Sequence, residues 1–273
     1  MYRDNNDGDN LTERTMTLAA ALERNDSLDR RTVACVIPAS REGIPAARLC
    51  AGCSMQPHCF PLGVRPADDA VSTRRRLYKG ATLFRAGHPF TAIYAIRSGS
   101  CKTVLLTEDG REQVSACHIR GEYLGLDGVG AGTHNCEAIA LEDSEICVLP
   151  FAHLEALARD SERMQQTIHR MLAGEIARER SIMLMLGTMR AEQRLAAFLL
   201  DLSRRYRARG YSSTEFVLRM TREEIGSYLG LKLETVSRLF SHMHREGLVQ
   251  VQGRVVKLLD LSALQGLVAS SGQ

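Results

Sequence analysis

Residues 164–186 read MQQTIHRMLAGEIARERSIMLML, and this stretch decides the fold because it is the one long helix-period segment and separates two differently patterned halves. Apolar side chains recur in it at spacings of three and four, which places them on one side of a helix. They are Met164, Ile168, Leu172, Ile176, Met183 and Leu186. Such a stripe is typical of a helix–helix interface. Glu179 interrupts the stripe, and a carboxylate is costly to bury.

The composition indicates a globular chain of one or two domains. Its 273 residues are 44% hydrophobic, enough to bury a proper core. Met1–Asn10 lacks the apolar core of a signal peptide, and no apolar run reaches the ~20 residues of a membrane span. We therefore expect a cytoplasmic protein without membrane contact. In that compartment the eight cysteines favour metal binding or redox chemistry over structural disulfides.

Three cysteines lie close together after a polar N-terminal tail. Cys50-x-x-Cys53 and Cys59 fall among prolines and glycines, which predicts a loop shaped by a bound ion or cluster. Three grouped cysteines with one distant partner fit an iron–sulfur cluster better than zinc, although His58 could support zinc. Unliganded cysteines are the third reading. The spacing leaves the fourth ligand open among Cys35, Cys101, Cys117, Cys136 and Cys147.

Residues 76–151 show short β-type runs separated by glycine turns. The runs are 92–96, 101–106, 113–119, 136–140 and 145–149. This spacing predicts an antiparallel roll or barrel. Pro150 closes the sheet region, and the helical pattern then continues to Gly187.

The pattern after residue 188 predicts a winged helix-turn-helix. A helix over 190–207 precedes a short strand at 215–220. Thr221 and Glu224 form a capping box that starts a helix through Leu229, Gly230 supplies the turn, and a second helix runs over 233–245. A hairpin over 248–258 completes the motif as a wing.

This third of the chain is also basic, with 13 Lys and Arg against 7 Asp and Glu over 189–257, a pattern expected of nucleic-acid-binding domains. In this motif the N-terminal residues of the second helix face the DNA bases. They are Glu234, Thr235, Ser237 and Arg238. Arg238 can donate two hydrogen bonds to guanine and Glu234 can accept one from cytosine. The alternative is that Glu234 and Arg238 only pair with each other on an exposed helix face.

The residues show no nucleophile–base constellation, phosphate loop or paired catalytic carboxylates, so we do not expect an enzyme.

Several stretches together resemble the CRP/FNR-type transcription regulators, specifically the oxygen-sensing FNR branch. The similarity covers about residues 49–264. It rests on the stretches 79–87, 94–99, 174–176 and 194–198, and on the helix-turn-helix over 220–238 with its Glu-x-x-Ser-Arg pattern.

The resemblance implies an α+β fold with an N-terminal antiparallel β-roll like that of cyclic-nucleotide-binding domains, a long dimerisation helix and a C-terminal winged helix-turn-helix. The corresponding domains are a polar tail over 1–48, the cysteine loop and β-roll over 49–151, the dimerisation helix over 152–187 and the DNA-binding domain over 188–273. On the dimerisation helix the interface residues would be Ile168, Leu172, Ile176, Glu179 and Met183.

The resemblance also implies cofactors and partners. The cysteines that match the family's ligands to one [4Fe-4S] cluster per subunit are Cys50, Cys53, Cys59 and Cys147. The arginine and small hydroxyl residue that hold the phosphate in cyclic-nucleotide-binding relatives are absent from residues 131–136, which argues against that ligand. The surface that touches RNA polymerase would be the loop of Thr107, Glu108, Asp109, Gly110 and Arg111.

Together these features predict an oxygen-responsive homodimer that binds double-stranded DNA at palindromes with TTGAT-type half-sites, with the cluster favouring the dimer and oxygen destroying it. The rivals are a CRP-type regulator that uses zinc or thiol redox chemistry, and one that binds a small effector in the β-roll. Across the two-fold axis Glu179 would lie near its twin and oppose dimerisation. Alternatively, Glu179 pairs with Arg178 or Arg180 of the partner helix and stabilises the dimer.

Overall fold

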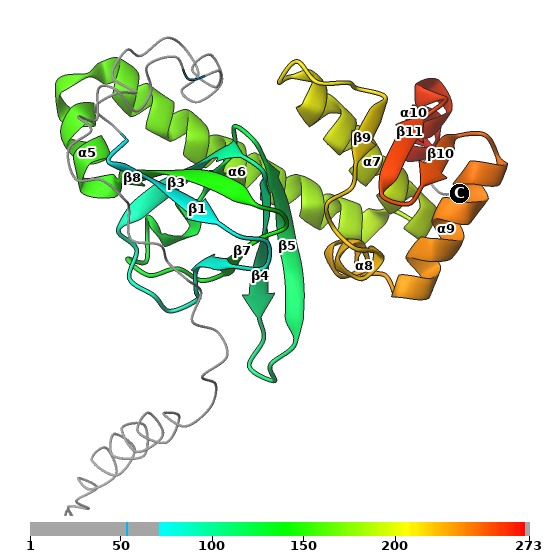
Figure 1. The fold of residues 1–273 in the computed structure, drawn as a ribbon, viewed down its shortest axis with the longest axis horizontal. Coiled ribbons are helices and arrows are strands. Elements are labelled where there is room, and N and C mark those ends of the chain that lie inside the picture. The colour runs from blue at the N-terminus through cyan, green and yellow to red at the C-terminus, as the bar shows by residue number, and fades with distance from the viewer. Residues whose placement is uncertain (1–52, 54–70, 271–273) are drawn as a thin grey trace, which may run out of the picture. The chain divides into compact units, whose positions relative to one another are not determined.

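The computed structural model describes Cys53 and residues 71–270. Its first half is built from β1 (Thr73–Leu77), β2 (Thr82–Phe84), β3 (Ala92–Ser98), β4 (Ser100–Leu106), β5 (Glu112–Ile119), β6 (Tyr123–Leu124), the short 3-10 helix η1 (Leu126–Gly128), β7 (Glu137–Ala140) and β8 (Ser144–Pro150). Next come the helices α5 (Phe151–Asp160), α6 (Glu162–Thr188) and α7 (Ala191–Arg207). The chain continues with β9 (Glu215–Val217), α8 (Arg222–Leu229), α9 (Leu233–Arg245), β10 (Val249–Gln252), β11 (Val255–Leu258) and α10 (Leu261–Ala269) (Figure 1).

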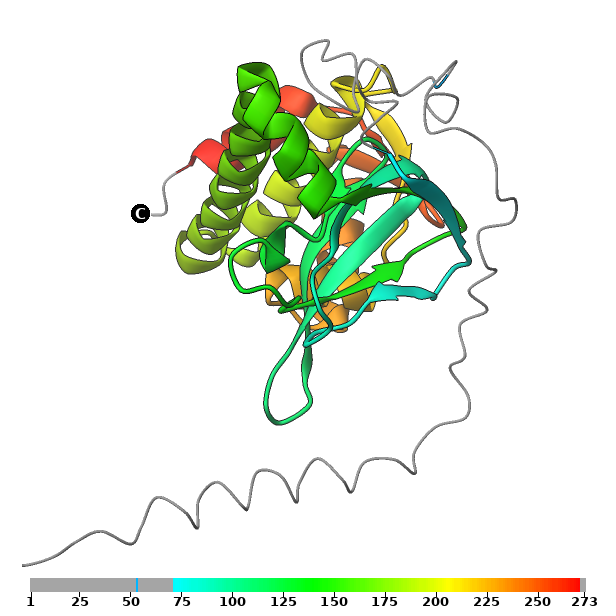
Figure 2. The same ribbon diagram turned by 90° about the vertical axis from the view of Figure 1, so that its left-hand side faces the viewer.

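The first half is an antiparallel β-roll, as the glycine-punctuated runs predict. Two four-stranded sheets, in the orders β1-β8-β3-β6 and β2-β7-β4-β5, enclose a core that includes Ile96, Leu124 and Ile146. The β4–β5 hairpin extends beyond the other strands (Figure 2). The short strands β1, β2 and β6 were not among the predicted runs, because three consecutive arginines or a run of two or three residues gives no clear alternation.

The helical run after Pro150 is divided at Ser161, where the sequence alone indicates continuous helix. Ser161 has an extended backbone, and its hydroxyl accepts a hydrogen bond from the amide of Met164, 3.2 Å away. It is therefore the N-cap of α6, and α5 ends one residue before it. Within the described residues, no helix combines the length and the apolar character that a membrane crossing requires.

Helix α6 carries two apolar faces, not the single stripe that its spacing suggests. Met164, Thr167 and Met171 are buried, with Met164 packed in the core shared by α5, β3 and β8. On another face, Ile176 is 50% exposed and Met183 is 72% exposed. Each four-residue step advances ~40° around an α-helix, so Met164 and Ile176, three such steps apart, lie ~120° from each other and face different sides.

The C-terminal third forms the predicted winged helix-turn-helix. Thr221 and Glu224 make the capping box, since each side chain accepts a hydrogen bond from the other residue's amide. Gly230 ends α8 in the left-handed conformation with φ of 64°. Gly226 allows the tight approach of α9, because a Cβ there would lie 2.6 Å from the carbonyl oxygen of Leu231. The wing is the β10–β11 hairpin, with β9 paired to β11.

The β4–β5 hairpin contacts the helix-turn-helix directly. The amide of Val114 on edge strand β5 donates to Ser227 Oγ on α8 at 2.9 Å, which satisfies a donor that an edge strand leaves unpaired. Lys102 Nζ on β4 lies 2.8 Å from Oε1 of the capping residue Glu224. Val104, Val114 and core residues of the DNA-binding domain share one hydrophobic cluster. The sheet therefore positions the first helix of the motif.

Candidate functional site

Helix α9 presents its polar N-terminal face outward. Val236, Phe240 and Met243 are buried and fix its orientation, and the guanidinium of Arg222 stacks 3.6 Å above the Phe240 ring. All four predicted base-reading residues lie on this helix, and Glu234, Ser237 and Arg238 are exposed while Thr235 is partly buried. Thr235, Ser237 and Arg238 line a shallow hollow together with His242 and Arg245.

Glu234 and Arg238 do not form an ion pair with each other, nor does either have another ion-pair partner within residues 71–270. The arrangement therefore leaves both side chains available for contacts outside the protein. The N-cap position of α9 is Lys232, which provides no side-chain hydrogen bond. The first-turn amides of the helix consequently lack a side-chain partner, and helix N-termini of this kind attract phosphate.

Cys147 lies in the middle of the β1-β8-β3 sheet and has an unusual set of neighbours. It is opposite Arg74 on β1 and Ala95 on β3. Directly opposite residues share a face of the sheet, as do residues two apart on one strand. Glu145 therefore lies on the same face, and Arg97, two residues after Ala95, forms an ion pair with Glu145.

Cys53 joins this cluster from the N-terminal segment. Its sulfur accepts a hydrogen bond from the Arg97 side chain, and it lies close enough to Cys147 to interact with it electrostatically. Cys50 and Cys59 lie outside the described residues, and in the part of the chain that is described no three His, Cys, Asp or Glu side chains converge on a metal position. Two of the four predicted ligands thus lie within electrostatic reach of each other, although they are far apart in sequence.

The electrostatics of this site fit a thiolate-bound group. Burial raises the pKa of the Cys147 thiol, while Arg74 and Arg97 oppose that rise. A metal that binds here must displace the thiol proton. The Nε atoms of Arg74 and Arg97 are buried without a hydrogen-bond partner in the described part of the chain. Buried donors normally have partners, so these two atoms suit an anionic group with acceptor sulfurs.

The remaining described cysteines are buried structural residues. Cys101 is fully buried in the β-roll core and Cys117 is buried beside the DNA-binding domain, as expected of small apolar side chains. Burial raises the pKa of each of these two thiols to about 12. Cys136 donates to Asp127 Oδ2 over 3.4 Å. None of the three shares the Cys147 environment.

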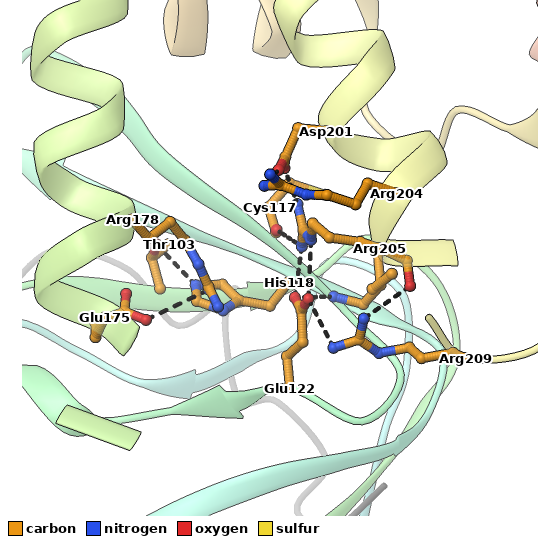
Figure 3. A network of polar contacts seen from close by, with 11 residues as sticks. Thr103, Cys117, His118, Glu122, Glu175, Arg178, Asp201, Arg204, Arg205 and Arg209 are labelled. Carbon is orange, nitrogen blue, oxygen red and sulfur yellow. Dashed lines mark hydrogen bonds and ion pairs between the residues drawn. The ribbon is translucent and has the colours of Figure 1, made fainter. Parts of the chain in front are cut away.

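A buried ion cluster joins the β-roll to α7. Glu122, in the turn between β5 and β6, is 3% exposed, and its carboxylate lies 2.8 Å from Arg205 Nε and 3.0 Å from Arg209 Nη2. Figure 3 shows both guanidinium groups directed at this carboxylate. Arg205 also donates to the backbone oxygen of Cys117 and pairs with Asp201. This cluster could not be predicted from the sequence, because nothing in a Gly-Glu-Tyr turn identifies its distant partners.

Charge, not burial, decides the protonation of Glu122. Burial alone would raise the pKa of this carboxyl group, but Arg205 and Arg209 outweigh that effect and lower the pKa from its ordinary 4.5 to about 2. Glu122 in turn raises the pKa of Arg205 against the effect of burial. The neighbouring His118 has its pKa lowered to about 3 by burial and is therefore neutral.

Comparison with known proteins identifies the family. A Crp-like helix-turn-helix domain matches residues 193–267, and a cyclic nucleotide-binding domain matches residues 74–161. The transcriptional regulatory protein btr of Bordetella pertussis is 46% identical, covering 82% of this chain and 95% of that protein. The chain belongs to the CRP/FNR family of transcription regulators. Like these relatives, it is a regulator and not an enzyme.

Two further relatives are similar to this chain over most of its length. The fumarate and nitrate reduction regulatory protein of Escherichia coli is 39% identical to this CRP/FNR member, covering 80% of this chain and 89% of the relative. The structure of FixK2 from Bradyrhizobium japonicum superimposes with a TM-score of 0.67 at 31% identity, covering 73% of this chain and 98% of FixK2. The β-roll, long helix and helix-turn-helix are the fold that the sequence predicts for a family member.

The interior of the β-roll in this CRP/FNR chain contains aromatic side chains. His134 stacks on Phe84 with ring centres 3.8 Å apart, and its Nδ1 lies 3.3 Å from Asp127 Oδ1. Phe90 contacts the same imidazole edge-on. His134 belongs to the segment over 131–136 that lacks the arginine expected of a phosphate-binding relative.

The predicted RNA polymerase loop is the exposed tip of the β4–β5 hairpin. Thr107 and Arg111 close it through their backbone groups, and Arg111 Nε lies 2.7 Å from Asp109 Oδ2. Glu108 and Gly110 are exposed in the turn between them. The loop therefore has a defined shape as well as exposure.

We predict that Glu122→Gln lowers the free energy of unfolding by about 3 kcal/mol at pH 7, because Arg205 and Arg209 would lose the buried carboxylate that they share, and Arg205 would keep only its pair with Asp201. The native pKa of Glu122 is depressed, so its contribution is complete above about pH 4.5 and is lost as the pH falls toward 2. Urea unfolding at several pH values should therefore show the gap between wild type and variant shrinking as the solution is acidified.

The matched control is Glu155→Gln, at an exposed position on α5. It should change the free energy of unfolding by less than about 0.5 kcal/mol. A gap for Glu122→Gln that stays constant between pH 7 and pH 3 would contradict the assignment of a buried, ionised carboxylate.

Proposed function

We propose that this CRP/FNR regulator is an oxygen-responsive homodimer of the cytoplasm that binds palindromic promoter sites with TTGAT-type half-sites. The proposed ligands of one [4Fe-4S] cluster per subunit are Cys50, Cys53, Cys59 and Cys147. The tip of the β4–β5 hairpin, Thr107–Arg111, is the proposed contact with RNA polymerase. No cyclic nucleotide is proposed, since His134 and its aromatic partners occupy the interior of the β-roll.

The observation that carries this proposal is the position of Cys53 within electrostatic reach of Cys147. The two cysteines come from opposite ends of the sensor region, yet both act electrostatically on a site with two arginines whose buried Nε donors lack partners among the described residues. When bound, the cluster supplies the oxygen-sensitive bond between the N-terminal cysteine segment and strand β8. A zinc or thiol-redox regulator would use the same cysteines, and metal analysis distinguishes it.

The packing around Cys147 gives a route from this site to the dimerisation helix. Cys147 belongs to a buried cluster with Ile93 and Leu149 of the sheet, Leu154 of α5 and Met164 of α6. A change in how Cys147 is held therefore acts on the first turns of α6 through this shared core. We infer that ligand binding at Cys147 fixes the orientation of α6 against the sheet.

The exposed face of α6 supports dimerisation through that helix. Ile176 and Met183 are exposed large apolar residues, and Ile168 and Leu172 are partly buried. Contiguous exposed apolar surface on a helix is typical of an interface. Glu179 is exposed in the same row. In a two-fold symmetric dimer it would lie near its twin, and the two charges would repel each other.

A first prediction tests the cysteine site. Anaerobically purified wild type should be brown and dimeric and should bind the palindrome tightly, and exposure to air should remove all three properties. Cys53→Ser should behave like air-exposed wild type under anaerobic conditions, because a ligand is missing. Size-exclusion chromatography measures the dimer, and fluorescence anisotropy measures DNA binding.

Cys101→Ala is the control, because Cys101 is buried in the β-roll core away from Cys147. It should retain the colour and the anaerobic DNA binding. If air-exposed wild type kept its full DNA affinity, the proposal that oxygen controls DNA binding would be wrong. If Cys53→Ser retained regulation, a β-roll effector would be the better explanation.

The base-reading role of α9 predicts a loss of discrimination in Arg238→Ala. A bidentate contact to guanine contributes about 1–3 kcal/mol, so the variant should bind the palindrome more weakly and tolerate a changed guanine in the half-site. Lys232→Ala should instead weaken binding to all sequences equally, as expected for a phosphate contact. Competition binding with single-base variants separates the two; equal losses on every sequence for Arg238→Ala would contradict base reading.

Glu179→Ala tests the effect of this charge on the dimer. If Glu179 repels its twin, the variant should form more dimer in air, with a dissociation constant lower by about tenfold. If Glu179 instead pairs with Arg178 or Arg180 of the partner subunit, the variant should form less dimer. Sedimentation velocity in air measures the change, and Glu155→Ala on α5 should leave the dimer unaffected.

A further inference from the structure

Three arginines lie on the sheet face that carries Cys147. Arg74 and Arg76 are opposite Cys147 and Glu145, so both share the face of those two residues. Arg97 occupies the irregular position of β3, where the register shifts between Ile96 and Ser98. Among the described residues of strands β1, β8 and β3 on this face, the one carboxylate against these three cations is that of Glu145.

Arg97 has contacts that a simple surface ion pair does not explain. Its Nη1 pairs with Glu145, while its side chain also donates to the sulfur of Cys53. Its Nε is buried and, within residues 71–270, lacks a hydrogen-bond partner. The guanidinium therefore bridges a carboxylate and a cysteine and still has an unused donor on the buried side.

Arg74 complements this arrangement from the other side of Cys147. Strand β8, which carries Cys147, lies between β1 and β3. Arg74 is on β1 and Arg97 is on β3, and Arg74 acts electrostatically on Cys147. Its Nε is also buried without a partner among the described residues. A neutral pair of thiols needs neither two cations nor two buried N–H donors, whereas an anionic sulfur-ligated group needs both.

We propose that Arg97, with Arg74 on the other side of Cys147, is a positioning residue of the cysteine site, which holds the Cys53 sulfur and offsets the negative charge of a thiolate-bound iron–sulfur group. This inference rests on the proposed function and adds to it a determinant of how long the group is retained. Thiolates outweigh the positive charge of such a core, so a neighbouring cation stabilises the site.

The test compares the two members of the Arg97–Glu145 pair, because they carry opposite charges. Anaerobic protein is reconstituted with iron and sulfide, and iron release to a ferrous chelator is followed without DNA. Arg97→Gln should release iron on the order of tenfold faster than wild type. Glu145→Gln removes the same ion pair but leaves the cation, so it should release iron at the wild-type rate or more slowly.

Two controls separate charge from folding. Arg97→Lys keeps the cation and should recover most of the wild-type rate. Arg85→Gln breaks a comparable pair, Arg85–Glu137, on the other sheet of the β-roll and should release iron as wild type does. Thermal unfolding of the metal-free variants should show Arg97→Gln and Glu145→Gln equally folded, since both lose the Arg97–Glu145 ion pair.

Equal acceleration in Arg97→Gln and Glu145→Gln would overturn the inference, because the pair would then matter only as a structural contact. Wild-type release rates in Arg97→Gln would overturn it as well. A wild-type chain that retains no iron and sulfide would overturn the proposed function and this inference together, whereas the first two outcomes leave the proposed function intact.

Discussion

The buried charge of Glu122 constrains how the sensor region meets the DNA-binding domain. A carboxylate that is 3% exposed must have close counter-charges, and both come from the DNA-binding domain, Arg205 from its first helix α7 and Arg209 from the turn that follows α7. Because Arg205 and Arg209 can satisfy Glu122 in few geometries, the position of α7 relative to the β-roll is specified more sharply than apolar packing alone would specify it. The Lys102–Glu224 pair and the Val114–Ser227 bond then set α8, and α9 follows through the glycine turn.

The cysteine site lies on the other sheet of the β-roll and reaches the same assembly through α6. Cys147 packs in one core with Met164, near the start of α6, while Glu175 and Arg178, further along the same helix, line a cavity with Glu122 and Arg209. Burial raises the pKa of Glu175, and Arg178 opposes that rise. Helix α6 thus contacts both the sensor core and the junction to α7. A change in the orientation of α6 near Cys147 can therefore reach α9, the proposed base-reading helix, through the junction of Glu122 with α7.

Local patterns predicted the C-terminal third well, since helix caps, glycine turns and the bounds of α9 depend on neighbouring residues. The same patterns failed where the outcome depends on distant contacts. The spacing in residues 164–186 could not separate the face of Met164 from that of Met183, because the sheet that buries one of them is remote in sequence. Helix α10 was not predicted, although Gln193 of α7 holds its end through Leu267 and Ser270.

The candidate site could be predicted only in part, because it too depends on contacts between residues that are distant in sequence. Spacing alone identified three cysteines but left the fourth ligand open, and only the family resemblance selected Cys147, which strand pairing then brings beside Arg74 and near Cys53. Arg97 carries no sequence signal, since its role depends on a register shift.

The most direct measurement of the proposed cluster is iron and sulfide analysis of anaerobically purified protein with its visible absorption spectrum. We expect about four iron and four sulfide per chain, lost in air. Stoichiometric zinc, or no metal at all, would contradict the proposed cluster.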